Sequence, residues 1–589
     1  MRLRKPFIAL TTAGLLTLAA CGGNGQAPGS AEGGAEVNTE GGNTGDARDP
    51  EREGPATIDG ATEGGTVTVL SASGLNSMDP TEAHYTNTSS ILQGLVTRSL
   101  TQLVYDPESG DQVLVPDLAT DLGTSNDDFT EWTFTIREGV RYQNGDEVTP
   151  EDIRFGMLRS MDRTAFPEGA AFSNDYFEGG DTYEGPYTGG NTDFDGITID
   201  GQDITISMRT PFPDMPYWGT FPAMGPIPEG KESNPANYAQ NPLATGPYMF
   251  DQYTPEKTLT LVRNPEWDPA TDPGRTQYPD EYVMDFQRES AQIDEILLND
   301  TGDAKTTLTF DDVQAANYPT FQSNSPDRLV TGGSPCTYYW APDYRKVKSK
   351  DVREAMLWAY PYRDSQVAAG NIVGVNRIVE ATNLMPAGIP GRETFNAVPD
   401  HEPGTTDAAK AKEILDAAGE TGYEVKFLFA NDDPNAVASK DVIVKAFREA
   451  GFTPRPVATT VAELSTVRAD PDADINIRSA GWCSDWPSGG SWFPPVMGST
   501  NLDAEGLGSN YAAFSEQDVD DKIDTILGSP IEEQPAMWNE LDQYIQEEYL
   551  PVITFAYTAA AMARGSQIEG FNVDQNLGMP TWKDIYVAQ

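Results

Sequence analysis

Groups that usually carry metal or nucleophilic chemistry are scarce in this chain, which has two histidines and three cysteines among 589 residues. His84 and His401 are far apart in the sequence, and neither has a metal-ligand neighbour. The sequence contains no HExxH, CxxC, GxSxG or P-loop motif. It therefore lacks the residues that usually form zinc sites, serine-nucleophile sites and nucleotide-binding sites. We therefore expect no metal, no cofactor and no enzymatic activity. A secreted hydrolase with two facing carboxylates stays an alternative, because 91 acidic residues guarantee chance pairs.

Basic residues are also few. The 39 lysines and arginines are outnumbered by 91 aspartates and glutamates, which gives a formal net charge of −52. Such an acidic chain repels nucleic acid and anionic lipid headgroups, and we exclude both as partners. The excess is compatible with cationic ligands, but solubility in a salty medium explains it better as a whole.

Apolar runs of membrane-spanning length are missing. The run Phe7–Ala20 follows three cationic residues and is too short to span a bilayer. It ends in Leu-Ala-Ala-Cys-Gly, which resembles the signal of bacterial lipoproteins. This resemblance implies that residues 1–20 are removed, that Cys21 carries the lipid, and that the body is held at the extracellular face of the cell membrane. An ordinary secretory signal with a chance cysteine is the alternative.

Apolar residues are nearly absent from residues 21–63, which we interpret as a disordered tether. Once the lipid occupies Cys21, only Cys336 and Cys483 remain, and two cysteines left in a secreted chain most simply form one disulfide. It would close a loop of roughly 150 residues and stabilise the fold by about 4–5 kcal/mol, less any strain.

Strand patterns dominate the first half of the body, and strands alternate with helices in the second half. In the first half we expect strands over 66–70, 132–137 and 258–262, a hairpin of 197–199 with 204–208, and a helix over 150–161. In the second half we expect helices over 351–360, 407–418, 440–450, 518–527 and 533–548, and strands over 425–429, 473–477 and 551–557. This alternation is typical of an α/β domain.

The loop from Gly481 to Pro487 carries the most specific chemical pattern, because Trp482 and Trp486 flank the carboxylate of Asp485. Indole rings supply apolar contact and a negative π-face, and the aspartate supplies a counter-charge, so the pattern suits a cationic ligand. Gly and Pro in this stretch disfavour regular structure. An aromatic core cluster in which Asp485 caps the next turn is the alternative.

Five short blocks, in order along the chain, resemble a known family. The chain is similar to extracytoplasmic solute-binding lipoproteins of the peptide/nickel class, family 5, the receptor components of ABC importers. The blocks are Met78–Asp79–Pro80, Gly139–Asp146 with Thr149–Asp152, Gly246–Pro247–Tyr248, Arg263–Trp267 and Lys350–Ala355.

The resemblance implies an α/β fold, a two-lobed periplasmic-binding-protein-like clamp with an extra β-rich subdomain inserted in lobe I. Lobe I would comprise residues 64–108, 226–335 and 553–589, the insert residues 109–225, and lobe II residues 336–552. Such a receptor is expected to be a monomer that delivers its ligand to the permease subunits and their ATPases.

The loop itself resembles oligopeptide-binding members, in which an aspartate pairs with the peptide's α-ammonium. Trp482–Trp486 matches their W-C-A-D-Y loop, and Cys336–Trp340 matches the strand whose cysteine bridges to it. The resemblance therefore implies a Cys336–Cys483 disulfide that positions the loop carrying Asp485. Of Trp482, Trp486, Tyr338, Tyr339 and Trp340, we expect about half to face the ligand, because side chains alternate along a strand. Tyr85 and Asn87 of lobe I are expected to face them, and a role as loop residues without ligand contact is the alternative. Arg363 and Arg478 are weak candidates for the far end of the ligand, and structural roles suit them better.

We expect a membrane-anchored receptor that captures oligopeptides by clamp closure. The alternative within the family is a different solute, namely a metal chelate, an oligosaccharide or a small cation. The alternative from another class is the secreted hydrolase.

Overall fold

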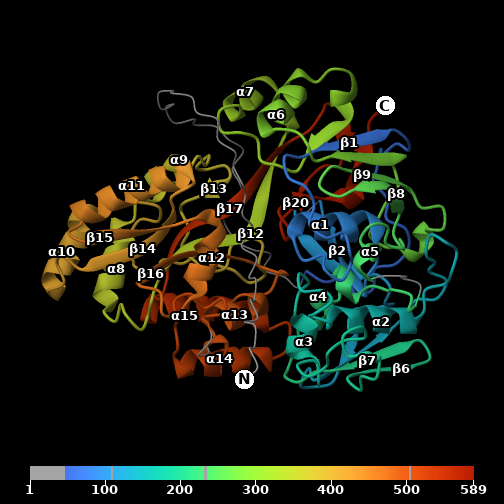
Figure 1. The fold of residues 1–589 in the computed structure, drawn as a ribbon, viewed down its shortest axis with the longest axis horizontal. Helices are drawn as coiled ribbons and strands as arrows, with labels where there is room; N and C mark the ends of the chain where they lie inside the picture. Colours follow the sequence, from blue (N-terminus) through green and yellow to red (C-terminus); the bar gives the residue numbers. More distant parts are fainter. Residues whose placement is uncertain (1–46, 108–109, 231–234, 503–505) are drawn as a thin grey trace, which may run out of the picture. The chain divides into compact units, whose positions relative to one another are not determined.

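The computed structural model describes residues 47–107, 110–230, 235–502 and 506–589, and its elements are labelled in Figure 1. Internal contacts divide the chain into two compact units. Unit 1 contains Gly333–Ala559, and unit 2 contains the described residues up to Gly332 together with Ala560–Gln589. The predicted signal peptide of residues 1–20 and the lipid site Cys21 lie outside the described residues.

Residues 47–63 belong to unit 2 and hydrogen-bond to the rest of it, although the sequence predicted a disordered tether as far as residue 63. The amide of Asp49 donates to the carbonyl of Leu114 (2.9 Å), and the hydroxyl of Thr62 donates to the carbonyl of Val587 (2.6 Å). Ordered structure therefore begins earlier than predicted. The prediction rested on low apolar content, which does not reveal hydrogen bonds to a neighbouring surface.

A five-stranded sheet of order β11-β1-β10-β9-β8 forms the centre of unit 2. Strand β1 is parallel to β10 and β11, whereas β10, β9 and β8 pair antiparallel. Val67 and Val69 are fully buried, as the alternating pattern of the predicted strand requires. The strands are β1 (Thr66–Leu70), β8 (Tyr248–Thr254), β9 (Thr258–Arg263), β10 (Glu281–Asp285) and β11 (Thr307–Thr309).

A smaller four-stranded sheet of order β4-β5-β7-β6 contains the predicted hairpin. Helix α2 (Pro150–Ser160) begins with a capping box, in which Thr149 and Asp152 each accept the other's backbone N–H. The sequence predictions of this hairpin and this helix are confirmed. The strands are β4 (Thr124–Ser125), β5 (Glu131–Thr135), β6 (Ile197–Asp200) and β7 (Asp203–Ser207).

Shorter elements complete unit 2. Its other helices are α1 (Thr86–Ile91), α3 (Phe172–Tyr176), α4 (Met215–Trp218), α5 (Pro235–Tyr238), α6 (Ser290–Asn299) and α7 (Tyr318–Asn324). Its other strands are β2 (Thr101–Tyr105), β3 (Gln112–Pro116), β18 (Ile568–Glu569), β19 (Val573–Asp574), β20 (Met579–Pro580) and β21 (Tyr586–Val587).

Unit 1 is built on a six-stranded sheet of order β13-β17-β12-β16-β14-β15. The chain passes between the units along β12 and β17, so residues 553–559, predicted for lobe I, lie in unit 1. The strands are β12 (Leu329–Pro342), β13 (Arg377–Ile378), β14 (Glu424–Ala430), β15 (Thr453–Thr459), β16 (Ile477–Cys483) and β17 (Ile553–Ala563).

Two hydrophobic cores include residues of this sheet. One gathers α8, α10 and α11, and the other gathers α13, α14 and α15, two groups that Figure 1 shows apart. The helices are α8 (Lys350–Ala359), α9 (Tyr362–Ala368), α10 (Ala408–Ala418), α11 (Pro434–Glu449), α12 (Val461–Ala469), α13 (Phe493–Met497), α14 (Gln517–Leu527) and α15 (Gln534–Glu548). The predicted α/β alternation of this half is confirmed.

One strand of unit 1 was predicted in the wrong place. The sequence indicated a strand over 473–477 and irregular structure from Gly481, whereas β16 begins at Ile477 and continues to Cys483. Pairing with β12 decides this, because every residue from Ile477 to Cys483 has an antiparallel partner there. Within the described ranges, no helix has both the length and the apolar character needed to cross a membrane.

Candidate functional site

The β12–β16 ladder brings the two sequence motifs of the predicted site together. Cys336 lies opposite Cys483, and Tyr338 lies opposite Gly481. The predicted disulfide between Cys336 and Cys483 is present and links residues 147 positions apart. It joins the end of β16 to β12 immediately before the loop that carries Asp485.

Serine hydrogen bonds hold this loop on both sides of Asp485, which is half-buried. The amide of Ser484 donates to the carbonyl of Pro335 (2.9 Å), and the hydroxyls of Ser484 and Ser491 lie 2.7 Å apart. Ser491 also donates to the carbonyl of Trp486 (2.9 Å). The backbone on either side of the carboxylate is therefore fixed by the fold.

The alternative interpretation, an aromatic core cluster in which Asp485 caps the next turn, holds for Trp486, whose side chain is buried. The turn Gly489–Ser491 is capped by Ser488, whose hydroxyl accepts the amide of Gly490 (3.0 Å). Ser488 therefore caps this turn, and the part of Asp485 in binding stays a prediction.

The predicted aromatic residues fall into two groups. Trp340 is 1% exposed, and its ring contacts those of Tyr360, Phe427 and Phe447 at 5.1–5.2 Å, so it belongs to the core rather than to a ligand surface. Trp486 and Tyr339 are also 1% exposed. Trp482 and Tyr338 are partly exposed. The sequence pattern could not separate the groups, because β12 is covered on both faces near Trp340.

Tyr338 packs on the backbone of its cross-strand partner. A Cβ atom added to Gly481 would approach the Tyr338 ring to 2.8 Å, so only glycine fits there without movement. The guanidinium of Arg377 on β13 lies 5.5 Å from the centre of the same ring.

The two cationic candidates differ in their surroundings. Arg478 is buried in an ion pair with Asp343 (2.8 Å), and Arg363 is exposed on α9. Burial by itself would raise the pKa of Asp343, but hydrogen bonds from Arg345 and Arg478 outweigh it and lower that pKa. Arg478 is thus structural.

Arg468, on α12, is a cation that sequence reasoning missed. It is 9% exposed, its guanidinium lies 4.9 Å from the ring centre of Tyr511, and Nη1 donates to the carbonyl of Ser479 (3.3 Å). Among the described residues, Nε of Arg468 and the hydroxyl of Tyr339 are buried without a hydrogen-bond partner. Burial and the neighbouring Tyr511 raise the pKa of Tyr339 against the effect of Arg468, so the hydroxyl stays a donor. Both groups are therefore buried donors that the described residues do not pair.

Tyr85 and Asn87 belong to unit 2. Tyr85 precedes α1, and burial followed by the charge of Glu168 raises its pKa. The side chain of Asn87 accepts the amide of Thr88 (2.8 Å). Both residues are partly exposed, and their part in binding stays a prediction.

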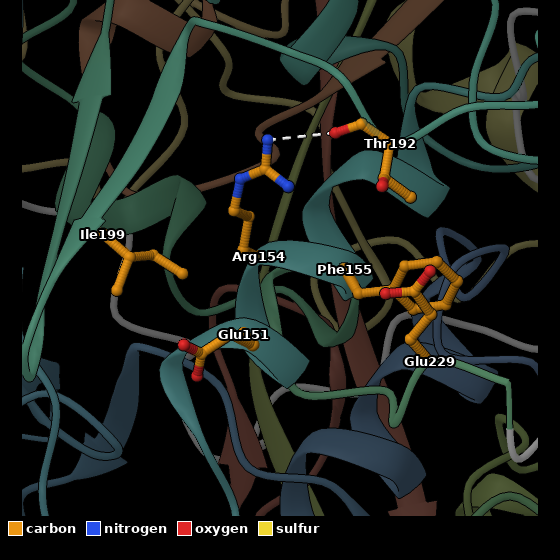
Figure 2. Close-up of a pocket in the computed structure, with 6 residues that line it drawn as sticks. All are labelled: Glu151, Arg154, Phe155, Thr192, Ile199 and Glu229. Carbon is orange, nitrogen blue, oxygen red and sulfur yellow. Dashed lines mark hydrogen bonds between the residues drawn. The ribbon is translucent and has the colours of Figure 1, made fainter.

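Unit 2 also contains a cavity of about 250 Å³ beside α2 (Figure 2). Arg154, at its centre, donates to the carbonyls of Thr192 (3.1 Å), Phe194 (2.9 Å) and Ile197 (3.0 Å), so this cation joins α2 to the hairpin. The lining residues are Glu151, Arg154, Phe155, Thr192, Ile199 and Glu229. In the part of the chain that the structure describes, no three or more His, Cys, Asp or Glu residues are grouped to hold a metal ion.

Comparison with known proteins gives a match to one family model. The model described as bacterial extracellular solute-binding proteins, family 5 Middle, matches residues 113–503. The periplasmic oligopeptide-binding protein OppA of Salmonella typhimurium is 23% identical over 242 residues, which are 39% of this chain and 41% of that protein. Heme-binding protein A of Haemophilus influenzae is 21% identical over 82% of this chain and 86% of that protein.

Solved structures agree on the fold. The clavulanic acid biosynthesis oligopeptide binding protein 2 matches with a TM-score of 0.81 at 22% identity, over 93% of this chain and 99% of that one. The murein tripeptide-binding protein MppA, in its unliganded open form, matches with a TM-score of 0.71 at 17% identity, over 91% and 98%. These matches confirm the predicted α/β fold of two-lobed solute-binding proteins.

Proposed function

Because this chain belongs to the bacterial extracellular solute-binding proteins of family 5, the binding components of ABC importers, we propose that it captures oligopeptides for a permease. Several relatives are named for binding oligopeptides or dipeptides, which supports this solute class. The relatives are binding proteins rather than enzymes, and we propose a receptor without turnover.

The placement of Asp485 carries the proposal. Its loop is joined to β12 by the Cys336–Cys483 disulfide and by the bond from Ser484 to Pro335, so the carboxylate is held in position before a ligand arrives. A peptide presents an α-ammonium at one end, and a fixed carboxylate is its natural partner. Trp482, partly exposed beside this loop, would supply apolar contact.

Arg468 and Tyr339 suit the other end of the peptide. Both present donors that are buried and unpaired among the described residues, and a ligand carboxylate would satisfy them. Arg468 donates a hydrogen bond to Ser479 on β16, the strand that leads to Asp485. The same strand therefore helps to position both Arg468 and Asp485, the proposed partners of the two peptide termini. We propose that Tyr338, Trp486, Tyr85 and Asn87 take lesser parts.

The remaining features of the proposal follow the family. We propose that the receptor is a monomer and captures its ligand by clamp closure. We also propose that lipid on Cys21 anchors it at the extracellular face of the cell membrane. The partners are the permease transmembrane subunits with their ATPases.

A second solute class is suggested by one relative. The relative named for binding heme matches over 82% of this chain, and the oligopeptide-binding protein OppA of Escherichia coli matches over 79%, so the two solute classes are matched over similar lengths. A non-peptide solute, such as a metal chelate, therefore remains the competing proposal, and an oligosaccharide or a small cation belongs to the same class.

Native mass spectrometry of the purified protein, followed by denaturation to release bound molecules, tests the proposal. We expect a family of co-purified masses that match short peptides. A single non-peptide mass would favour the competing solute. An empty protein would be titrated calorimetrically with alanine-based peptides and with hemin, and binding of hemin alone would reject the peptide proposal.

A further inference from the structure

Arg377 is a cation whose hydrogen-bonding capacity is largely unused. A guanidinium carries five N–H donors, and the single hydrogen bond of this side chain within the described residues runs from Nη1 to the carbonyl of Asn376 (2.7 Å). No carboxylate in the described part of the chain forms an ion pair with it. The side chain is partly exposed, so a ligand can reach it.

Other arginines of unit 1 use more of their hydrogen-bond donors or pair with a carboxylate. Arg353 donates to the carbonyls of Val347, Lys348, Tyr549 and Leu550. Arg478 is paired with Asp343, and Arg455 with Glu424. Arg377 differs from these residues because it has neither an acidic partner nor a set of carbonyl acceptors for its donors within the described residues.

The backbone holds Arg377 in a fixed place. Arg377 pairs with Thr558 across the β13–β17 ladder, and its carbonyl accepts the amide of Gly374 (2.8 Å). Its guanidinium lies over the ring of Tyr338, which itself rests on Gly481. Both contacts orient the cation without neutralising it.

Arg377 also lies close to the proposed ammonium site. Tyr338 is two residues from Cys336, which is bonded to Cys483, and Asp485 follows two residues later. The four residue steps from Gly481 to Asp485 span at most about 14 Å. An extended peptide advances about 3.3 Å per residue, so a group that reaches Arg377 belongs to the first few residues of the ligand.

We propose that Arg377 is a specificity-determining residue that binds a carboxylate of the ligand near its N-terminal end. This inference rests on the proposed peptide function. The carboxylate is either an acidic side chain or the C-terminus of a very short peptide, and both present the same planar acceptor to the guanidinium.

Calorimetric titration with matched peptides tests the inference. The probes are alanine tetrapeptides with Glu or Gln at position two, three or four, and alanine dipeptides and tripeptides, each with a free or an amidated C-terminus. For at least one matched pair, we expect the unmodified protein to bind the carboxylate form about ten- to a hundredfold more tightly than the neutral one. A preference for Glu that persists in amidated peptides identifies the side chain as the source, and one confined to free short peptides identifies the C-terminus.

Arg377→Gln should abolish this preference, so that the carboxylate and neutral forms of each pair bind with equal affinity. Arg363→Gln is the matched control, because it removes an exposed cation of the same unit and should keep the preference. Equal affinity of the unmodified protein for every pair, or an undiminished preference in Arg377→Gln, overturns the role of Arg377 but not the peptide function. Failure of all peptides to bind overturns both.

Discussion

The ring of Tyr338 lies against Gly481 so closely that an added Cβ would come within 2.8 Å of it. These residues are cross-strand partners on β12 and β16, and the strand that contains Gly481 leads directly to the disulfide and Asp485. A change at Gly481 is therefore felt at Tyr338, and through it at Arg377.

Gly481→Ala should displace the Tyr338 ring and lower the free energy of unfolding by about 1–3 kcal/mol, because the new methyl group overpacks the site. Peptide affinity should fall as well. Gly528→Ala is the control, since its added Cβ meets only ordinary contacts at 3.6 Å or more. Urea unfolding and calorimetric titration of both variants provide the measurement, and equal stability of the two would contradict the packing argument.

Replacing both cysteines, as C336S/C483S, should lower the free energy of unfolding by about 2–5 kcal/mol, because the unfolded chain loses a long-range link. Peptide affinity should also fall, since the loop that carries Asp485 loses its attachment to β12. Guanidinium unfolding and peptide titration measure the two effects separately. A variant with unchanged affinity would show that the serine hydrogen bonds suffice to hold the loop.

Asp485→Asn should weaken peptide binding by about a hundredfold or more, because a buried ammonium left without its counter-charge costs about 3–5 kcal/mol. Its melting temperature should stay close to that of the unmodified protein. Asp524→Asn, an exposed change on α14, is the control for the loss of one negative charge. Titration with a tetra-alanine peptide decides the matter, and an unchanged dissociation constant for Asp485→Asn would remove the ammonium assignment.

Local rules predicted much of the fold. Strand 66–70 and helix 150–161 carried their own signals, namely alternating apolar residues and a capping box, and both formed where expected. The start of β16 was wrong because it depends on pairing with β12, more than a hundred residues away in the chain. Hydrogen bonds made by residues 47–63 also escaped prediction, since composition does not record them.

The part of the candidate site that has a sequence motif could be predicted, and the residues that belong to no motif were missed. The Trp-Cys-Ser-Asp-Trp loop and the disulfide could be recognised because they are contiguous or chemically unique. Arg468 and Arg377 could not, since each matters only for what surrounds it in three dimensions. Arg478 lies in the same stretch of sequence as Arg468 yet is neutralised by Asp343, a difference that only the tertiary structure reveals.

The Arg478–Asp343 pair leads to a prediction about acid stability. Because the pKa of Asp343 in the folded protein is lower than in the unfolded chain, about 3.9, folding is favoured when this carboxyl is ionised. Its contribution is fully present above the unfolded pKa and is lost as the pH falls through the folded pKa. Asp343→Asn should therefore lower the free energy of unfolding by about 3–5 kcal/mol at pH 7, because it leaves Arg478 buried without a counter-charge.

The difference between Asp343→Asn and the unmodified protein should stay constant from pH 7 to about pH 5 and shrink below about pH 4, where the unfolded chain takes up the proton. Urea unfolding at a series of pH values measures it. Asp416→Asn is a suitable control, because that carboxylate pairs with Lys412 on the exposed side of α10 and should contribute little at any pH. A difference for Asp343→Asn that stays constant down to pH 3 would mean that packing and not the charge of Asp343 provides the stabilisation.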